Sequence, residues 1–218
     1  MMWQEDEEGN HYVDNGYIVD VIFRLQGKTL PVNYHFPLHQ ALVQLSPWLA
    51  DENIGVHLII AGEEGNGWLR EDDPQGILYI SRRTRLMLRI NRAQLPLIDE
   101  LVNKVLKLGE HELVLQSYAT QALSQITTMY AHHVASDVES EEDFMQQVLS
   151  ELKASDIRCK KMLCGKTRSL DKQNSQVQTR SLMLADLSVE DAIKLQQQGV
   201  GPLRNLGCGI FVPHKSLK

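Results

Sequence analysis

The chain has 218 residues, of which 43% are hydrophobic, and its formal net charge is −6. This length fits one large domain or two small ones, and the hydrophobic content excludes a disordered chain. No apolar run approaches the ~18 residues of a transmembrane helix, and the acidic N-terminus lacks the apolar core of a signal peptide. We therefore expect a cytoplasmic protein without a membrane partner, with its three cysteines reduced.

The charge is distributed unevenly along the chain. Residues 1–20 and 136–144 together hold 11 acidic residues and no Lys or Arg, whereas residues 157–218 hold 11 Lys and Arg against 4 Asp and Glu. A basic C-terminal half favours a polyanionic partner, although ordinary scatter of surface charge explains it equally well.

In chain order, the first half predicts the element order β-α-β-β-α-β. Alternating apolar residues indicate a strand over 17–32, and helical apolar spacing indicates a helix over 37–50 with Pro37 in its first turn. A second helix is expected over 93–106. Further strands are expected over 56–62, 77–91 (one strand or a pair) and 111–123.

The second half repeats this order of elements. Strands are expected over 124–136, 157–166, 176–187 and 207–214. Helices are expected over 140–155 and 188–199, where Ser140 and Ser188 can cap the first turns. The order β-α-β-β-α-β is that of the ferredoxin-like unit, so the predicted fold class is α+β with two tandem ferredoxin-like domains. We expect an acidic N-terminal segment (1–16), an N-terminal domain (17–120) and a C-terminal domain (121–218).

A glycine-rich segment, GVGPLRNLGCG, lies between the last expected helix and the last expected strand. Its glycines are Gly199, Gly201, Gly207 and Gly209. One glycine would suffice to end the helix, whereas two pairs permit close backbone approach and offer bare N–H groups to phosphate oxygens. Arg204 is expected at the charged tip of this loop. The dinucleotide-binding fingerprint is excluded because that motif follows a strand and opens a helix.

This glycine pattern resembles the signature of the RAMP superfamily of CRISPR-associated RNA-binding proteins, in which two Gly-hydrophobic-Gly triplets are separated by five residues. Within that superfamily the chain is similar to the repeat-cleaving endoribonucleases of Cas family six, and among these to the subtype first described in myxobacteria. The segments that carry the similarity are GNGWLR (65–70), SRRTRL (81–86), KMLCG (161–165), TRSLMLADL (179–187) and LGCGIFVPHK (206–215). The resemblance covers nearly the whole chain and implies cleavage of CRISPR precursor RNA within its repeats.

The resemblance also implies a reaction without a metal or any other cofactor. The ribose 2′-OH attacks the neighbouring phosphate and leaves a 2′,3′-cyclic phosphate, which needs a base, an acid and positive charge at the phosphate. In related enzymes the catalytic histidine lies at the start of the first helix, which implies His39 as general acid or base, His35 as the alternative, and Tyr34 as an aid to the 2′-OH or phosphate. Lys28 is a candidate for stabilising the transition state on position alone. The alternative for His39 is a half-buried structural histidine.

The residues themselves give no support for a metal site. Cys159 and Cys164 are too sparse a pair, and His132 and His133 on one strand would point to opposite faces.

Basic residues gather in two segments, 81–92 and 158–168. In the first, Arg83, Arg85 and Arg89 share one strand face, opposite an apolar face. The second leads into a polar loop, which predicts a basic hairpin. The expected RNA contacts are Arg82, Arg83, Arg85, Arg158, Lys160, Lys161, Lys166, Arg168, Arg180, Arg204 and the four glycines. With only 6% aromatic residues, recognition of a repeat stem-loop by shape and backbone fits better than widespread base stacking.

Two other functions remain open at this point. One is a non-catalytic RAMP protein that binds RNA together with other subunits of a CRISPR effector complex. The other is a generic ferredoxin-like domain that binds RNA or regulates another protein. His39 at the expected helix start favours the endoribonuclease, because RNA binding alone does not need it.

Overall fold

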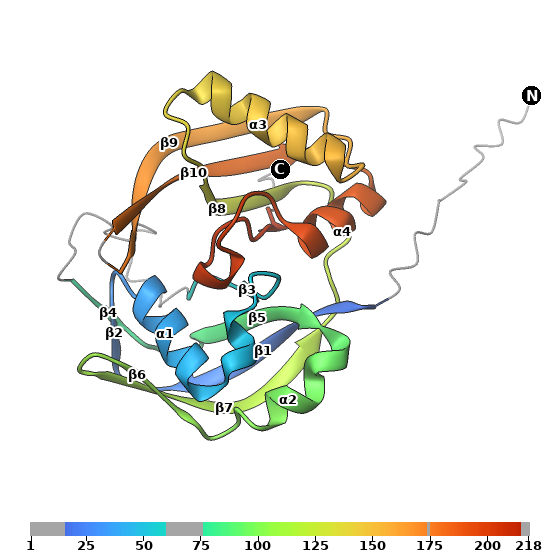
Figure 1. Cartoon of the computed structure of the whole chain (residues 1–218). Helices are drawn as coiled ribbons and strands as arrows, with labels where there is room; N and C mark the ends of the chain where they lie inside the picture. The colour runs from blue at the N-terminus through green and yellow to red at the C-terminus, as the bar shows by residue number, and fades with distance from the viewer. Residues whose placement is uncertain (1–15, 60–75, 174, 215–218) are drawn as a thin grey trace, which may run out of the picture.

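The computed structural model describes residues 16–59, 76–173 and 175–214. Within these residues the two larger sheets come one from each half of the chain, and the glycine-rich segment lies between them (Figure 1). The acidic N-terminal segment expected over 1–16 lies outside the described residues, except for Gly16. The GNGWLR motif (65–70) also lies outside them.

The N-terminal half forms a five-stranded sheet with the order β3-β5-β1-β7-β6. Its strands are β1 (Ile18–Gln26), β3 (Gly55–Val56), β5 (Arg85–Asn91), β6 (Val105–Leu108) and β7 (His111–Gln121). A separate ribbon pairs β2 (Thr29–Pro31) with β4 (Ile77–Tyr79). The helices are α1 (His35–Leu45) and α2 (Leu95–Asp99), with short 3₁₀ turns at Pro47–Ala50 and Arg92–Gln94.

One face of this sheet and both helices form the first core. Val21 and Phe23 of β1 point into it, as the alternation predicts, and pack with Leu38 and Leu42 of α1 and Ile98 of α2. All five side chains are at most 1% exposed, so the helices are held by burial of their apolar stripes.

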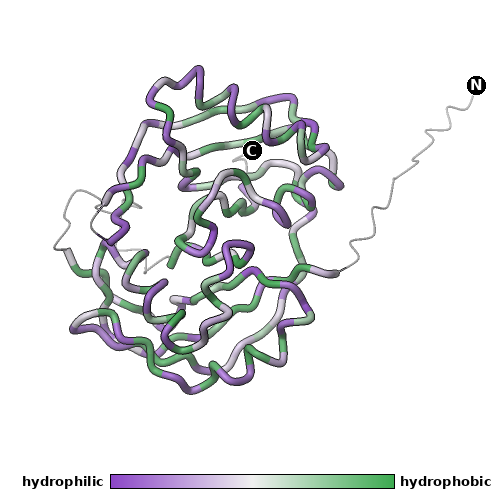
Figure 2. The backbone as a smooth tube through the Cα atoms, in the orientation of Figure 1, coloured by the Kyte–Doolittle hydropathy of each residue, from purple (hydrophilic) through white to green (hydrophobic). Residues whose placement is uncertain are grey.

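The C-terminal half forms a four-stranded sheet with the order β11-β8-β10-β9. Its elements are β8 (Met129–Ala135), α3 (Glu141–Ala154), β9 (Lys161–Lys172), β10 (Ser175–Ala185), α4 (Val189–Gln198), a 3₁₀ turn (Arg204–Leu206) and β11 (Val212–Pro213). Phe144 of α3 and Leu195 of α4 pack on Leu182 and Leu184 of β10, so both helices cover one face of the sheet. Figure 2 shows the hydrophobic residues running along the strands of both halves.

Both sheets have the strand order of the ferredoxin-like unit, in which the first and third strands of each unit are central. In the first, β1 and β5 are the central strands between β3 and β7, and β6 extends the edge; in the second, β8 and β10 are central. The predicted tandem ferredoxin-like fold is therefore confirmed. Ser140 and Ser188 cap α3 and α4 as expected, because each hydroxyl accepts a hydrogen bond at 3.0 Å from the backbone N–H three residues later.

The helix expected over 93–106 is wrong in its second half. The helix ends at Asp99, and Asn103 takes a left-handed backbone conformation with φ of 64°. Residues 105–108 then form β6 and pair with β7, with Leu106 opposite Leu113. The apolar spacing of Leu106 and Leu108 suits the buried face of a strand as well as a helix, which is why periodicity alone misplaced them.

Two other boundaries differ in the C-terminal half. The polar loop expected between the strands is mostly paired, because β9 continues to Lys172 and β10 begins at Ser175. The last strand contains only Val212 and Pro213, because the glycine-rich segment before it forms turns with positive φ values. The hairpin is therefore longer, and the last strand shorter, than the sequence predicts.

Arg89 joins the two halves. Its guanidinium donates to both carboxylate oxygens of Asp20 at 2.8 and 2.9 Å. It also donates to the backbone carbonyls of Gln196 at 3.2 Å and Phe211 at 2.9 Å. Arg89 lies on the same face of β5 as Arg85, opposite the apolar face, as the sequence predicts. The C-terminal half covers this face at Arg89 and leaves the residue 1% exposed.

Candidate active site between the two sheets

Tyr34 lies directly before α1 and is 4% exposed. Its hydroxyl accepts a hydrogen bond from the backbone N–H of Ile59 at 2.8 Å, and its ring stacks on His35 with the centroids 4.5 Å apart. Tyr34 therefore anchors the start of the helix and orients the neighbouring imidazole.

His35 faces the C-terminal half of the molecule. Its Nδ1 lies 3.0 Å from the carbonyl oxygen of Leu206, and its ring meets that of His133 edge to face, with centroids 5.5 Å apart. Burial lowers the pKa of His35 to about 4. The ring is therefore neutral near pH 7, and because a carbonyl only accepts, Nδ1 carries the proton.

His39 lies one turn further along α1 and is only partly buried. Its imidazole hydrogen-bonds to the backbone of Asn205, in the 3₁₀ turn of the glycine-rich segment. Burial lowers the pKa of His39 below its usual 6.5, the charge of Lys172 lowers it further, and the Asn205 contact opposes the shift. A half-exposed, unprotonated imidazole beside a cation is suited to accept a proton from a substrate hydroxyl.

Lys172 reaches this place because the end of the β9–β10 hairpin packs on the start of α1. The side chain of Asn33 donates to the carboxylate of Asp171 at 3.2 Å, which fastens the hairpin there. Of the described lysines, Lys172 is the one whose charge acts on the pKa of His39. Lys28, the lysine considered from sequence, lies between β1 and β2, where its carbonyl accepts from Ile80. Sequence reasoning missed Lys172 because it falls in a segment read as a polar loop.

The four glycine N–H groups already have acceptors within the protein. Those of Gly199, Gly207 and Gly209 donate to backbone carbonyls at 2.8, 3.0 and 2.7 Å, and that of Gly201 donates to the Glu151 carboxylate at 2.7 Å. These N–H groups are therefore not bare, contrary to what the sequence suggested, and the expected contact of the glycines with phosphate stays a prediction.

The glycines instead allow backbone to pack against backbone. A Cβ atom on Gly199 would lie 2.6 Å from the carbonyl oxygen of Gly209, and one on Gly209 would overlap the carbonyl of Val200. A Cβ atom on Gly207 would lie 3.3 Å from both the Nδ1 of His35 and the carbonyl oxygen of Val56, so this glycine packs tightly against α1 and β3. The segment thus holds the Leu206 carbonyl against α1.

Arg204 is buried and does not form an exposed tip. It is 7% exposed, and its guanidinium lies 3.5 Å from the carbonyl oxygen of Gln196. Burial lowers its pKa to about 10, and the charge of Arg89 adds to that shift. Next to it, the side chain of Asn205 donates a hydrogen bond to the carbonyl of Ala50 at 3.0 Å, so this turn packs against the N-terminal half.

The first group of predicted RNA contacts lies in the turn before β5. Arg82 and Arg83 are exposed there. Arg85 instead donates to the carbonyls of Arg82 and Thr84, both at 2.8 Å, so its guanidinium fastens its own turn.

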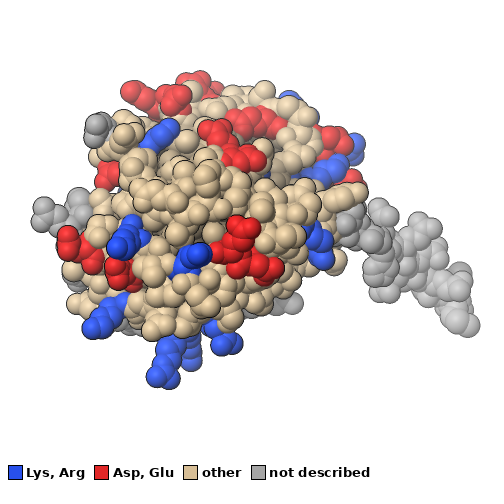
Figure 3. Space-filling view, turned by 60° about the horizontal axis from the view of Figure 1, so that its bottom comes forward, with Lys and Arg blue, Asp and Glu red and all other residues tan. Residues whose placement is uncertain are grey.

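The second group lies in the segment just before β9, along β9 and on its partner strand β10. Arg158, Lys160, Lys166 and Arg168 are exposed. The remaining two, Lys161 and Arg180, already have partners: Lys161 pairs with Asp186 at 2.8 Å, and Arg180 donates to the carbonyl of Glu139 at 2.7 Å. On the face seen in Figure 3, basic and acidic side chains are interspersed, and the basic ones form no continuous patch there.

Comparisons with known proteins agree with this architecture. The model of the Cas6 family, with the description "Cas6 Crispr", matches residues 19–216. The chain is similar to the CRISPR-associated endonuclease Cas6 of Myxococcus xanthus (strain DK1622), with 27% identity over 197 residues that cover 89% of this chain and 81% of the relative.

Solved structures have the same fold at low sequence identity. A structure described as that of a Cas6-related gene from Pyrococcus furiosus has a TM-score of 0.62 and 16% identity, and the match covers 91% of this chain and 98% of that one. A structure of the CRISPR endoribonuclease Cse3 bound to 19 nt RNA has a TM-score of 0.50 and 13% identity, covering 89% and 97%.

This chain belongs to the Cas6 family of CRISPR-associated proteins. The resemblance inferred from the glycine pattern and the other motifs is thereby confirmed, and a generic ferredoxin-like domain is excluded. None of the helices in the described parts of the chain is long and apolar enough to cross a membrane.

Proposed function

We propose that this protein is an endoribonuclease that cleaves CRISPR precursor RNA within its repeats. The observation that carries the proposal is the placement of His39, partly exposed on α1, near the end of the β9–β10 hairpin, where Asp171 contacts Asn33 and the charge of Lys172 acts on the imidazole. The Myxococcus relative, named as an endonuclease, and the RNA-bound Cse3 structure support the reaction class and the partner. The substrate that fits best is a repeat stem-loop.

In this proposal His39 acts as the general base. Its lowered pKa keeps it unprotonated near neutral pH, so it can take the proton of the ribose 2′-OH as that oxygen attacks the phosphate. The P–O bond to the leaving 5′-oxygen breaks and a 2′,3′-cyclic phosphate remains. Lys172 offers its charge to the phosphate. The leaving 5′-oxygen takes up a proton from water as its bond to phosphorus breaks, so the proposed step balances without a metal ion.

His35 and Tyr34 act as positioning residues. The Nδ1–H of His35 is held by the Leu206 carbonyl, and Tyr34 stacks on the ring and is itself held by the Ile59 N–H. Tyr34 is buried and His35 is half-buried, and their contacts fix the start of α1 and thereby the direction of His39.

We also propose the division into domains 17–120 and 121–218, which makes the site composite. The first domain contributes His39, and the second contributes Lys172. The exposed cations of the hairpin, Lys166 and Arg168, are the proposed path of the RNA backbone towards this pair.

Cleavage of repeat RNA in EDTA tests the proposal. The wild type should cut and leave a cyclic phosphate that mass spectrometry identifies. The variant His39→Ala should cut about 10²–10⁴-fold more slowly, and a deoxyribose at the scissile nucleotide should abolish cutting. The matched control His111→Ala changes a histidine that is bonded to Thr29, away from the site, and should cut normally.

A second comparison tests the role of Lys172. Lys172→Ala should lower kcat, while Lys107→Ala, on the exposed edge strand β6, should not. A wild type that binds repeat RNA but does not cut it would instead make the chain a non-catalytic RAMP subunit. Equal rates for the wild type and His39→Ala would remove the assignment of the base.

A further inference from the structure

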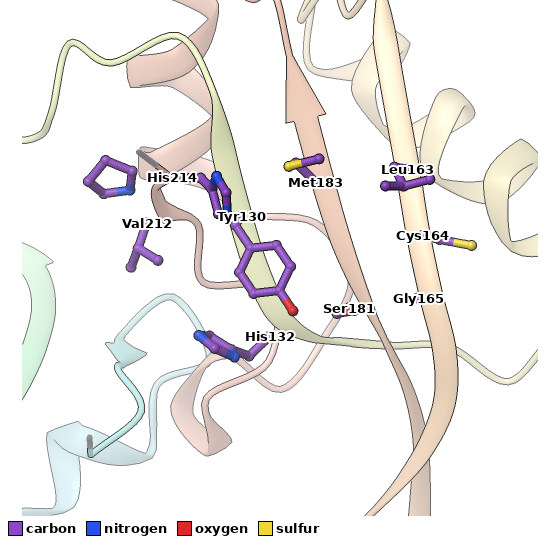
Figure 4. Close-up of a pocket in the computed structure, with 10 residues that line it drawn as sticks. Tyr130, His132, Leu163, Cys164, Gly165, Ser181, Met183, Val212 and His214 are labelled. Atoms are coloured by element: carbon purple, nitrogen blue, oxygen red, sulfur yellow. The ribbon is translucent and has the colours of Figure 1, made fainter. Parts of the chain in front are cut away.

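The C-terminal sheet has an open face opposite α3 and α4. Because Met129, Leu182 and Leu184 point to the helices, the side chains that alternate with them, Tyr130 and Met183, point the other way. They help to line a cavity of about 550 Å³ on that face (Figure 4). Protein pockets for small ligands commonly measure about 300–1,000 Å³.

Rings and apolar side chains dominate this pocket. The ring of Tyr130 is flanked by those of His132 and His214, with centroids 4.8 and 5.9 Å away. Leu163 of the edge strand β9 lies across the pocket and is 63% exposed, so it offers an apolar wall to a ligand. Such a surface favours a flat, partly apolar ligand.

Cations lie towards the β9 side of the pocket, where the Cys164 thiol also interacts with one carboxylate, that of Glu141. Among the described residues that line it, none is acidic. The guanidinium of Arg168 acts electrostatically on His132, and Lys166 directly follows Gly165, which is part of the lining. An anionic group attached to the flat ligand would therefore be attracted to the β9 side.

The pocket is connected to the candidate active site through one strand. Strand β8 has a register shift against β10 at His132 and His133, since Arg180 pairs with Val134 and Leu182 with Ala131. His132 lines the pocket, and His133 meets the ring of His35. A ligand in the pocket and a substrate at His39 can therefore belong to one RNA strand.

We propose that this pocket binds one unpaired nucleotide of the RNA, with its base against the ring of Tyr130 and its phosphate towards Arg168. Every base has a stacking face, and sheets of this type stack bases on rings of their two central strands. Here the central strand β8 supplies the rings of Tyr130 and His132, and the central strand β10 supplies Met183. The proposal rests on the proposed function for the identity of the ligand. It adds a single stacking site to a protein whose low aromatic content excludes widespread stacking.

The test is an abasic scan of a repeat RNA that carries a deoxyribose at the scissile nucleotide, so that binding is measured without cutting. For the wild type, one unpaired position should weaken binding about 5- to 150-fold when its base is removed. The Tyr130→Ala variant should bind intact RNA more weakly by a similar factor. Its affinity should no longer change when the base at that position is removed. Tyr130→Phe should behave like the wild type.

Two controls keep the test decisive. Tyr79→Ala removes a tyrosine that is 70% exposed in β4 and should leave both affinity and the scan unchanged. If Tyr130→Ala fails to fold, Leu163→Ala probes the opposite wall of the pocket. In this variant, removing the base at the same position should cost less RNA affinity than it does in the wild type. 2-Aminopurine placed there should be quenched on binding the wild type.

The outcomes separate this inference from the proposed function. Binding without any base position coupled to Tyr130 overturns the pocket assignment and leaves the endoribonuclease intact. Position-specific coupling in a protein that never cuts the all-ribose RNA supports the pocket and refutes the enzyme. Failure of the wild type to bind repeat RNA refutes both.

Discussion

At the scale of single residues, burial distinguishes two histidines one turn apart on α1. His35 is enclosed by Tyr34, Gly207 and the Leu206 carbonyl, so its pKa falls to about 4, whereas His39 remains partly open. The ordinary helical spacing of the two residues contains no sign of this difference. It arises because the glycine-rich segment of the other half closes over one ring and only touches the other.

His35 makes a prediction about stability in acid. Its folded-state pKa of about 4 lies below the usual 6.5, so the unfolded chain binds more protons between these values. Stability should therefore be greatest above pH ~6.5 and should fall as the pH drops towards about 4. His35→Asn, which keeps an amide donor for the Leu206 carbonyl, should lose less stability than the wild type between about pH 7 and 5.

Urea unfolding at several pH values measures this difference. Burial lowers the pKa of His133 to about 3, so the free energy of unfolding of the variant should still fall somewhat as the pH drops. Parallel stability curves for the wild type and His35→Asn would contradict the assignment of His35 as a buried neutral ring.

At the scale of elements, the glycine-rich segment acts by close packing. Both of its Gly-hydrophobic-Gly triplets lie backbone against backbone, with no room for a side chain at Gly199 or Gly209. The sequence pattern correctly marks the family, but the physical role of the glycines is the fit between the end of α4, the 3₁₀ turn and β8.

A matched pair of substitutions tests this role. Gly209 and Gly109 have nearly equal positive φ values, 64° and 61°, but a Cβ atom overlaps Val200 at the first and meets nothing within 4 Å at the second. Gly109→Ala should cost about 1–2 kcal/mol, the strain of the left-handed backbone alone. Gly209→Ala should cost clearly more and should also slow cleavage.

Urea unfolding and the RNA cleavage assay measure the two effects. Equal destabilisation by the two substitutions would contradict the close-packing account, because only backbone strain would then be at work.

At the scale of the whole molecule, a buried polar contact ties the two sheets together. Arg89 and Asp20 pair on the face of the N-terminal sheet that α1 and α2 leave open, and the carbonyls of Gln196 and Phe211 complete the guanidinium's hydrogen bonds. His57 also lies 3.3 Å from the Asp20 carboxylate. The Arg89 guanidinium and the His57 hydrogen bond keep the pKa of Asp20 far below its usual value despite burial.

Removing one partner of this pair should be costly. Arg89→Met leaves a buried carboxylate without its cation and should destabilise the protein by about 3–5 kcal/mol. Asp20→Asn combined with Arg89→Met should recover part of that loss, because no unpaired charge remains. Chemical unfolding of both variants and of Asp20→Asn alone gives the coupling, and simple additivity would contradict a direct buried pair.

Much of the fold could be predicted because it depends on local periodicity. Alternation in β1 and β5, the caps at Ser140 and Ser188, and the repeated element order are all visible in the sequence and agree with the structure. The family and the first helix with its two histidines were predicted from motifs. The strand β6 was not, because four residues with alternating apolar side chains also fit the end of a helix.

The sequence by itself therefore determined the tandem fold, the family and the segment that carries His35 and His39. Only the tertiary structure decided which arginines are buried, as Arg89 and Arg204 are, and that the charge of Lys172 acts on His39. The physical reason is distance along the chain. Local sequence patterns indicate which residues share a face of a strand or helix. The burial and pKa of the site residues instead depend on contacts between segments more than a hundred residues apart, which form when the two sheets pack together.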